Sequence, residues 1–174
     1  MGTGLSVASF LTLPFGAEKK VSDFTLVSGS VNFPVNDRLS FGLAGGFGFD
    51  TNGSKSMAVF DASGKFNYND YLNANIRNRF KIGDDAQSYQ LRVSPLSVSY
   101  PVGNCSIYLN PNCKVAYDFS SHKVTPSFSA FAGVAVPLKD GKEVDIEFEG
   151  YDLNKAFVGD LDKTSFSVNG IVKF

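Results

Sequence analysis

Large hydrophobic and small residues alternate along the segment RLSFGLAGGFGFD, residues 38–50. Alternate positions hold Leu39, Phe41, Leu43, Phe47 and Phe49, with one interruption at Gly45, while the positions between them hold only Ser, Gly or Ala. A period of two predicts a β-strand whose large side chains share one face. The other face is almost bare, and glycine weakens a strand that is exposed to water. The pattern is therefore not typical of a soluble sheet.

The same alternation recurs in ten segments that are separated by turn residues. Several exceed ten residues, whereas strands of soluble proteins average about five or six. A tilted strand that crosses a bilayer needs about 9–11 residues. We predict an all-β fold, an antiparallel up-and-down transmembrane β-barrel, as one domain over residues 1–174. The ten predicted strands cover residues 4–13, 21–33, 38–50, 56–68, 71–82, 87–100, 105–119, 123–138, 142–152 and 163–174.

One region leaves the strand count open. Residues 94–112 contain three prolines, and Val93 and Leu96 do not fit one uninterrupted alternation. A bulge at Pro95 would keep ten strands, whereas a long loop would reduce the count to eight.

The connections fall into two groups. An even strand count returns the C-terminus to the end of the barrel where the chain starts. Short turns are expected at that end, at residues 34–37, 69–70 and 139–141 and after Tyr100. The loops of the opposite end are expected at 14–20, 51–55, 83–87, 120–122 and 153–162. Aromatic residues gather at the turn end and predict an interfacial girdle there: Phe33, Phe66, Tyr68, Tyr71, Tyr100 and Phe174.

Charged residues follow the same period of two. Arg77 and Arg79 share one face of their segment, and the acidic residues of 143–149 share one face of theirs. A soluble β-sandwich would explain this with charges in water and apolar side chains in the core. A transmembrane barrel explains it with apolar side chains in lipid and charges in the lumen. The bare face of residues 38–50 favours the barrel, because it would leave room for long charged side chains.

The barrel hypothesis assigns a direction to each candidate residue. The expected lipid-facing residues are Phe41, Leu43, Phe47, Phe49, Ile76, Phe80, Ile146 and Phe148. The expected lumen charge network comprises Arg77, Arg79, Lys81, Arg92, Glu143, Asp145, Glu147 and Glu149. In a ring of ten strands the fifth lies nearly across from the ninth, so we expect the basic row of 71–82 to meet the acidic row of 142–152.

Composition excludes several classes of protein. The net charge of −1 argues against a nucleic-acid partner, which a basic surplus would indicate. No apolar run approaches the roughly 18 residues of a membrane-spanning helix. The first ten residues show no basic segment followed by an apolar one, so we expect no signal peptide there.

Cysteine chemistry offers two alternatives. Cys105 and Cys113 enclose seven residues, and their even number and short spacing predict a small disulfide loop in an oxidising compartment. The alternative is two free thiols. Two cysteines with the single histidine, His122, fall short of a zinc site. We expect no metal and no cofactor.

The final ten residues, SFSVNGIVKF, alternate and end on an aromatic residue. The residues of one face are Phe166, Val168, Gly170, Val172 and Phe174. This segment resembles the assembly signal of bacterial outer-membrane β-barrels, and the chain as a whole resembles the small, opacity-type members of that class. The resemblance implies insertion by the outer-membrane assembly machinery into a bilayer that contains lipopolysaccharide. It implies a location in the bacterial outer membrane, and we expect a monomer.

The sequence permits one catalytic hypothesis and two non-enzymatic ones. His122 lies near Asp118, Ser120 and Ser121, which suggests a Ser/His/acid constellation. The His-x-Ser order of barrel lipid A deacylases is absent, because Lys123 and Val124 follow His122. We expect no enzyme. The predicted function is a structural or surface barrel whose narrow, charge-lined lumen is closed by ion pairs, since barrels near eight strands are filled by side chains. The alternative is a narrow channel for small solutes or ions.

Overall fold

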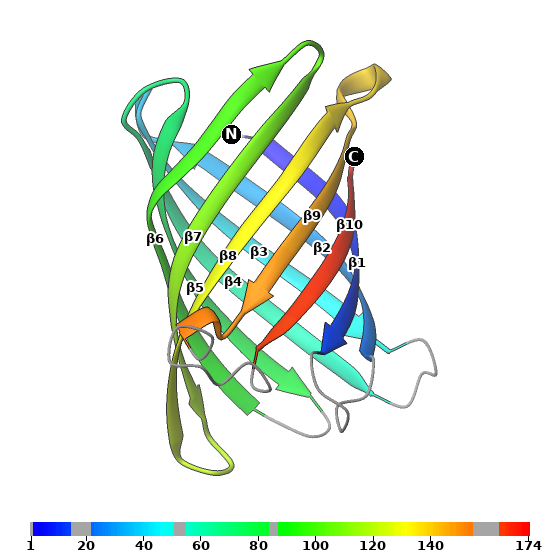
Figure 1. Ribbon diagram of the computed structural model, residues 1–174, viewed down its shortest axis with the longest axis vertical. Helices are drawn as coiled ribbons and strands as arrows, with labels where there is room; N and C mark the ends of the chain where they lie inside the picture. The colour runs from blue at the N-terminus through cyan, green and yellow to red at the C-terminus, as the bar shows by residue number, and fades with distance from the viewer. Residues whose placement is uncertain (1, 15–21, 51–54, 84–86, 155–163) are drawn as a thin grey trace.

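The computed structural model describes residues 2–14, 22–50, 55–83, 87–154 and 164–174. Ten antiparallel strands form one closed barrel (Figure 1). They are β1 (Gly2–Pro14), β2 (Ser22–Pro34), β3 (Leu39–Phe49), β4 (Ser56–Asn67), β5 (Leu72–Gly83), β6 (Gln87–Val102), β7 (Cys105–Asp118), β8 (Lys123–Pro137), β9 (Glu143–Tyr151) and β10 (Ser165–Lys173). The predicted fold class is confirmed.

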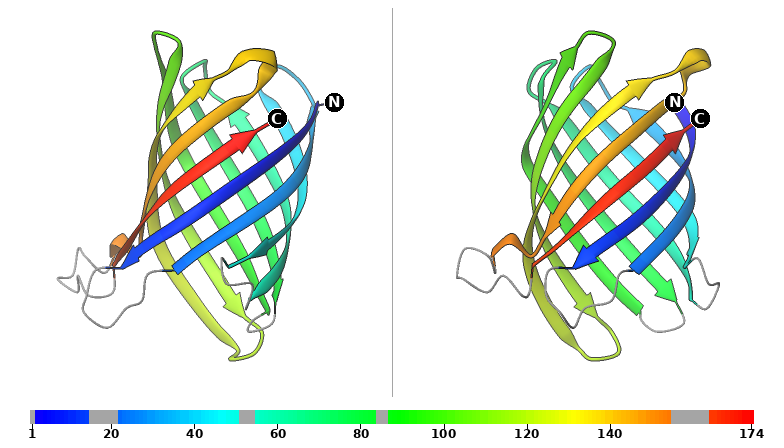
Figure 2. Two further views of the ribbon diagram at one scale, coloured as in Figure 1. Left: turned by 90° about the vertical axis from the view of Figure 1, so that its right-hand side faces the viewer. Right: turned by 45° about the vertical axis from the view of Figure 1, so that its right-hand side comes forward.

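Each strand pairs with its neighbours in the sequence, and the ring closes where β1 pairs with β10. That seam runs in register from Ser6 opposite Lys173 to Pro14 opposite Ser165. The only 3₁₀ turn assigned among the described residues is η1 (Lys139–Gly141), and no helix there is long and apolar enough to cross a membrane. Figure 2 shows both chain ends at the same end of the barrel, as an even strand count requires.

Two of the short turns at this end are built in the same way. The side-chain oxygen of Asn36 accepts hydrogen bonds from the backbone N–H groups of Arg38 and Leu39, at 2.9 and 2.8 Å. Asn69 does the same for the N–H groups two and three residues further on, at the same distances. These Asx turns reverse the chain without a glycine. The predicted turns at 34–37 and 69–70 are confirmed, whereas the predicted loops at 14–20, 51–55, 83–87 and 153–162 lie mostly outside the described residues.

The irregular region of the sequence is a bulge within one long strand. β6 continues through Pro95, and its pairing with β7 shifts register between Val93 and Val98. Val93 and Leu96 both lie on the outer face, although they are three residues apart. The bulge absorbs the extra residue that would otherwise turn Leu96 inward. The strand count is therefore ten and not eight.

The interior of the barrel is more polar than its exterior. Among the described residues four apolar side chains are buried, and ten polar or charged ones are. Leu43 and Phe148 are 57% and 56% exposed, and similar side chains cover the outside of the ring. A soluble sandwich would bury these groups, so that alternative is wrong.

The bare face of β3 is occupied by side chains of its neighbours. A Cβ atom on Gly46 would lie 2.7 Å from the carbonyl oxygen of Val27 and 3.1 Å from Leu26 Cδ1. A Cβ atom on Gly48 would overlap the ring of Phe24. β3 therefore needs glycine at these two positions, because atoms of β2 occupy the space that a side chain would fill. The hypothesis that this face makes room for the charge network is wrong for this end of β3.

The predicted aromatic residues gather on the outside at the turn end. Phe66 and Tyr68 meet edge to face with ring centroids 5.3 Å apart, and Tyr71 lies 5.5 Å from Tyr100. All six of the predicted girdle residues are exposed. Exposed aromatic rings at one level of a barrel are typical of a membrane–water interface.

Candidate functional site in the lumen

The inward positions of β5, β6 and β7 carry a basic wall. Arg77, Arg79 and Lys81 alternate along β5, Arg92 follows on β6 and Lys114 on β7. The strand register places Arg77 opposite Arg92, and Arg92 opposite Lys114. Three cations therefore stand side by side across three neighbouring strands.

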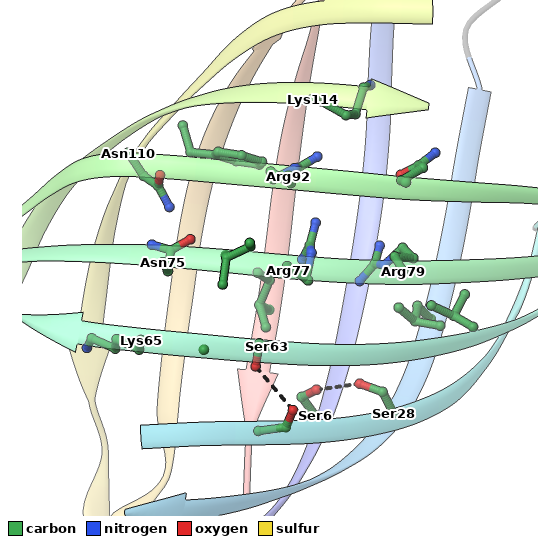
Figure 3. A pocket seen from close by; sticks show the side chains of 18 of the residues that line it. Ser6, Ser28, Ser63, Lys65, Asn75, Arg77, Arg79, Arg92, Asn110 and Lys114 are labelled. Carbon is green, nitrogen blue, oxygen red and sulfur yellow. Dashed lines mark hydrogen bonds between the residues drawn. The ribbon is translucent and has the colours of Figure 1, made fainter. Parts of the chain in front are cut away.

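These side chains line a cavity of about 760 Å³ inside the barrel. Figure 3 shows Arg77, Arg79, Arg92 and Lys114 extending into it from the three strands. The opposite wall is uncharged and rich in hydroxyl groups, where Ser6 Oγ and Ser28 Oγ lie 2.8 Å apart. Glu147 and Glu149 of β9 also line the cavity, which therefore has a basic wall, a hydroxyl-rich wall and two carboxylates.

Arg79 forms an ion pair with a residue of the adjacent strand. Its Nη2 and Nε atoms donate to the two carboxylate oxygens of Asp61 at 2.6 and 2.7 Å, a bidentate contact. Asp61 lies directly opposite Arg79 in the β4–β5 register. The expectation that the basic row of β5 pairs with β9 is wrong, because Arg79 has a nearer partner beside it and Arg77 forms no ion pair with a described residue.

The ion pair that crosses the lumen starts on β6. Arg92 Nη2 donates to Glu149 Oε1 at 3.3 Å, and its guanidinium carbon lies 4.6 Å from the centroid of the Phe131 ring. β6 is three strands from β9 around the ring, whereas β5 is four strands away, so the span is shorter from β6. Glu149 is only 3% exposed. Arg92 thus bridges the lumen to β8 and β9.

A second polar cluster lies on the same acidic row. Glu147 accepts hydrogen bonds from Tyr108 Oη at 3.1 Å and from Asn169 Nδ2 at 3.0 Å. The Tyr108 side chain passes over Gly133, where an added Cβ would lie 2.6 Å from the ring carbon Cζ. The absence of a side chain at Gly133 therefore lets Tyr108 of β7 cross β8 and bind Glu147 of β9.

The acidic row ends at the turn end of the barrel. Lys173 Nζ lies 2.6 Å from Glu143 and 2.7 Å from Asp145, so one cation from β10 serves both carboxylates. A further cavity of about 460 Å³ is lined by these three residues together with Tyr108 and Glu147. The lumen is therefore basic near its middle and acidic toward the turn end.

The predicted disulfide is wrong. Cys105 and Cys113 are free, and both belong to β7. Eight residue-to-residue steps along an extended strand place their Cα atoms about 26 Å apart, and a disulfide bond needs less than about 7 Å. The turn that precedes β7 uses Gly103, at φ 60°, in place of a cysteine loop.

The groups near His122 do not form a triad. Its Nδ1 atom lies 3.0 Å from Tyr117 Oη. Asp118 instead accepts the backbone N–H groups of Ser121 and Ser120 at 2.8 and 2.9 Å. These two amides, Ser121 first, hold the pKa of the Asp118 carboxyl below its usual value. The carboxylate stabilises the loop turn and makes no hydrogen bond to the imidazole.

The remaining predicted residues lie on the outer face. Exposed side chains include all eight predicted lipid-facing residues, which are Phe41, Leu43, Phe47, Phe49, Ile76, Phe80, Ile146 and Phe148. On β10, Phe166 is exposed on the same face, and the register sets Val168 opposite Phe148, Gly170 opposite Ile146 and Val172 opposite Val144. The final residue, Phe174, is exposed at the turn end.

Several residues of the lumen were missed. Asp61 and Lys65 share the inward parity of β4, and Tyr108 and Lys114 share that of β7. The alternation of these segments contains the signal, because each polar residue takes a position between apolar ones. Asn169 shows the same inward parity, but its hydrogen bond to Glu147 depends on the register between β9 and β10.

No protein-family model and no curated protein sequence matches this chain. Solved structures are similar in fold. A NanC porin is 11% identical, with a TM-score of 0.54 and 99% of each chain covered. A KdgM porin is 11% identical, with a TM-score of 0.51 and 98% of each chain covered. At this identity the similarity establishes the fold alone: this chain has the fold of a small porin barrel.

Proposed function

We propose that this chain is an integral barrel of the bacterial outer membrane with a structural or surface function. The observation that carries the proposal is the inverted polarity of the barrel. An apolar band of this extent on a soluble monomer would far exceed the few hundred square ångströms that such proteins usually expose. A bilayer removes the cost of exposing it. The porin fold supports the same location.

We further propose that contacts across the lumen close it to the free flow of solutes. Arg92 supports this, because its side chain crosses from β6 to Phe131 of β8 and Glu149 of β9. Inward apolar side chains such as Leu26 and Val59 narrow the loop half of the cavity. A barrel of ten strands lies near the size at which side chains fill the interior.

The partners of such a barrel follow from its surface. The apolar exterior suits lipid and lipopolysaccharide, and the alternating β10 with its terminal Phe174 suits recognition by the outer-membrane assembly machinery. Ring closure leaves no free strand edge for pairing with a second chain. This supports a monomer. We propose no catalytic function for the loop rim.

A narrow channel is the second candidate function. The cavity of about 760 Å³ and the basic wall around it favour this alternative, because charged walls attract small ions of opposite sign. The two functions differ in whether ions pass through the barrel under voltage.

Conductance across a planar lipid bilayer tests closure. The unmodified barrel is expected to give no discrete, reproducible openings. The double variant Arg92→Ala/Glu149→Ala, which removes the bridge, is expected to give small openings. The matched variant Lys173→Ala/Glu143→Ala removes an ion pair near the turn end and is expected to stay closed. Regular openings of the unmodified barrel would reject closure and favour the channel.

A further inference from the structure

The row formed by Arg77, Arg92 and Lys114, here called the basic belt, is an unfavourable arrangement by itself. Each residue lies directly opposite the next in the strand register, with Ser127 continuing the row on β8. Like charges at directly opposite positions of an antiparallel sheet destabilise it. A fold that keeps three of them in one row needs negative charge nearby.

The carboxylates that line this cavity are fewer than the cations around it. Arg77, Lys81 and Lys114 form no ion pair with a described residue. The Lys114 ammonium lies over the face of the Tyr151 ring, 5.7 Å from its centroid. Arg92 has one carboxylate, that of Glu149, at 3.3 Å. The belt and Lys81 therefore carry four positive charges, whereas the lining of the same cavity holds two carboxylates, those of Glu147 and Glu149.

The cavity beside the belt has the size and the donors of a binding site. Small-molecule sites typically measure about 300–1,000 Å³, and this cavity is about 760 Å³. Ser28, Asn75 and Asn110 add hydroxyl and amide groups to its lining. The Nε atom of Arg92 is buried and has no hydrogen-bond acceptor among the described residues. A donor without an acceptor in a basic cavity points to a missing anionic group.

We propose that the basic belt binds a small molecule that carries two or more phosphate or carboxylate groups. The guanidinium groups of Arg77 and Arg92 offer the planar donor pairs that such groups accept in bidentate fashion. The ammonium groups of Lys81 and Lys114 complete the charge balance. The site rests on the folded barrel within the proposed function and is independent of whether the lumen conducts.

Isothermal titration calorimetry of the whole barrel in a neutral detergent tests this site with inorganic pyrophosphate as the probe. Saturable binding of one pyrophosphate per barrel is expected, with no equivalent heat from sodium chloride at equal ionic strength. Arg77→Gln is expected to weaken binding about tenfold or more, because it removes a charge-assisted contact. Lys139→Gln, the same change of charge outside the cavity, is expected to bind like the unmodified barrel.

Thermal unfolding followed by circular dichroism separates ligand binding from a structural function of the belt. Arg77→Gln without pyrophosphate is expected to unfold at a higher temperature than the unmodified barrel, because like charges no longer oppose each other. A second variant, Lys114→Gln, is expected to do the same. The proposal fails if the unmodified barrel binds no pyrophosphate, or if both variants bind it undiminished. Since binding in detergent needs no conductance, such a failure leaves the closure of the lumen unaffected.

Discussion

Glu149→Ala is expected to lower the free energy of unfolding by about 3 kcal/mol, because breaking a buried ion pair leaves an uncompensated charge. The charge left behind is that of Arg92, which stands between two other cations of the basic belt. Glu149 is almost fully buried, so water screens its ion pair with Arg92 little. Urea-induced unfolding of the barrel in phosphatidylcholine vesicles measures the change.

Glu143→Ala is the matched control, because it removes the same group from the same face of β9. Its partner Lys173 is 48% exposed, and an exposed ion pair contributes up to about 1 kcal/mol. Equal losses for the two variants would show that the bridge from β6 to β9 contributes no more than a surface contact.

Phe60→Arg is expected to destabilise the barrel in lipid by about 2–4 kcal/mol, the cost of arginine on the lipid face near the bilayer midplane. Phe60 is 55% exposed on the outer face of β4, near the middle of that strand. If this face lay in water, the same substitution would not lower the free energy of unfolding, because a charged side chain would replace an exposed apolar one. The expected loss therefore depends on the bilayer.

Phe66→Arg provides the control on the same strand and the same face. Phe66 lies at the turn end beside Tyr68, where the girdle meets the membrane surface. Arginine near an interface costs about 0–1 kcal/mol. Unfolding in vesicles measures both variants. If the two substitutions cost the same, depth in a bilayer does not govern the stability of this strand.

The strands could be predicted from sequence, because alternation marks each of them directly. The segment predicted at 71–82 is β5, Leu72–Gly83, and the segment predicted at 123–138 is β8, Lys123–Pro137. A period of two also shows which residues of a strand share a face. The sequence therefore predicted that the charged rows point into the lumen. The polarity of the barrel could be predicted for the same reason.

The ion pairs within the lumen could not be predicted from the sequence. Alternation shows which face of a strand a residue occupies, but not which residue of the next strand lies opposite it. The Asp61–Arg79 pair depends on the turn that joins β4 to β5, and one residue more in that turn would separate the two. The sequence of β3 alone does not show what fills the space above its small residues, because Phe24 and the other side chains that do so belong to neighbouring strands. The disulfide prediction was wrong because the spacing of two cysteines does not show whether they lie in a loop or in one long strand.

The apolar face of this barrel is expected to contact lipid. Spin labels test it most directly, once both native cysteines are replaced by alanine and single cysteines are introduced. Outward positions for the label are Leu43, Phe80 and Ile146, which are all exposed. Inward positions are Ser28 and Asn75, which line the cavity. Each labelled barrel is reconstituted in vesicles and exposed to oxygen, which is soluble in lipid, or to a water-soluble nickel complex.

We expect oxygen to relax the outward labels strongly and the nickel complex to reach them poorly. The inward labels should show less contact with oxygen. If the nickel complex reaches the outward labels as readily as it reaches a label in free solution, the apolar face lies in water and the account of a membrane barrel is wrong.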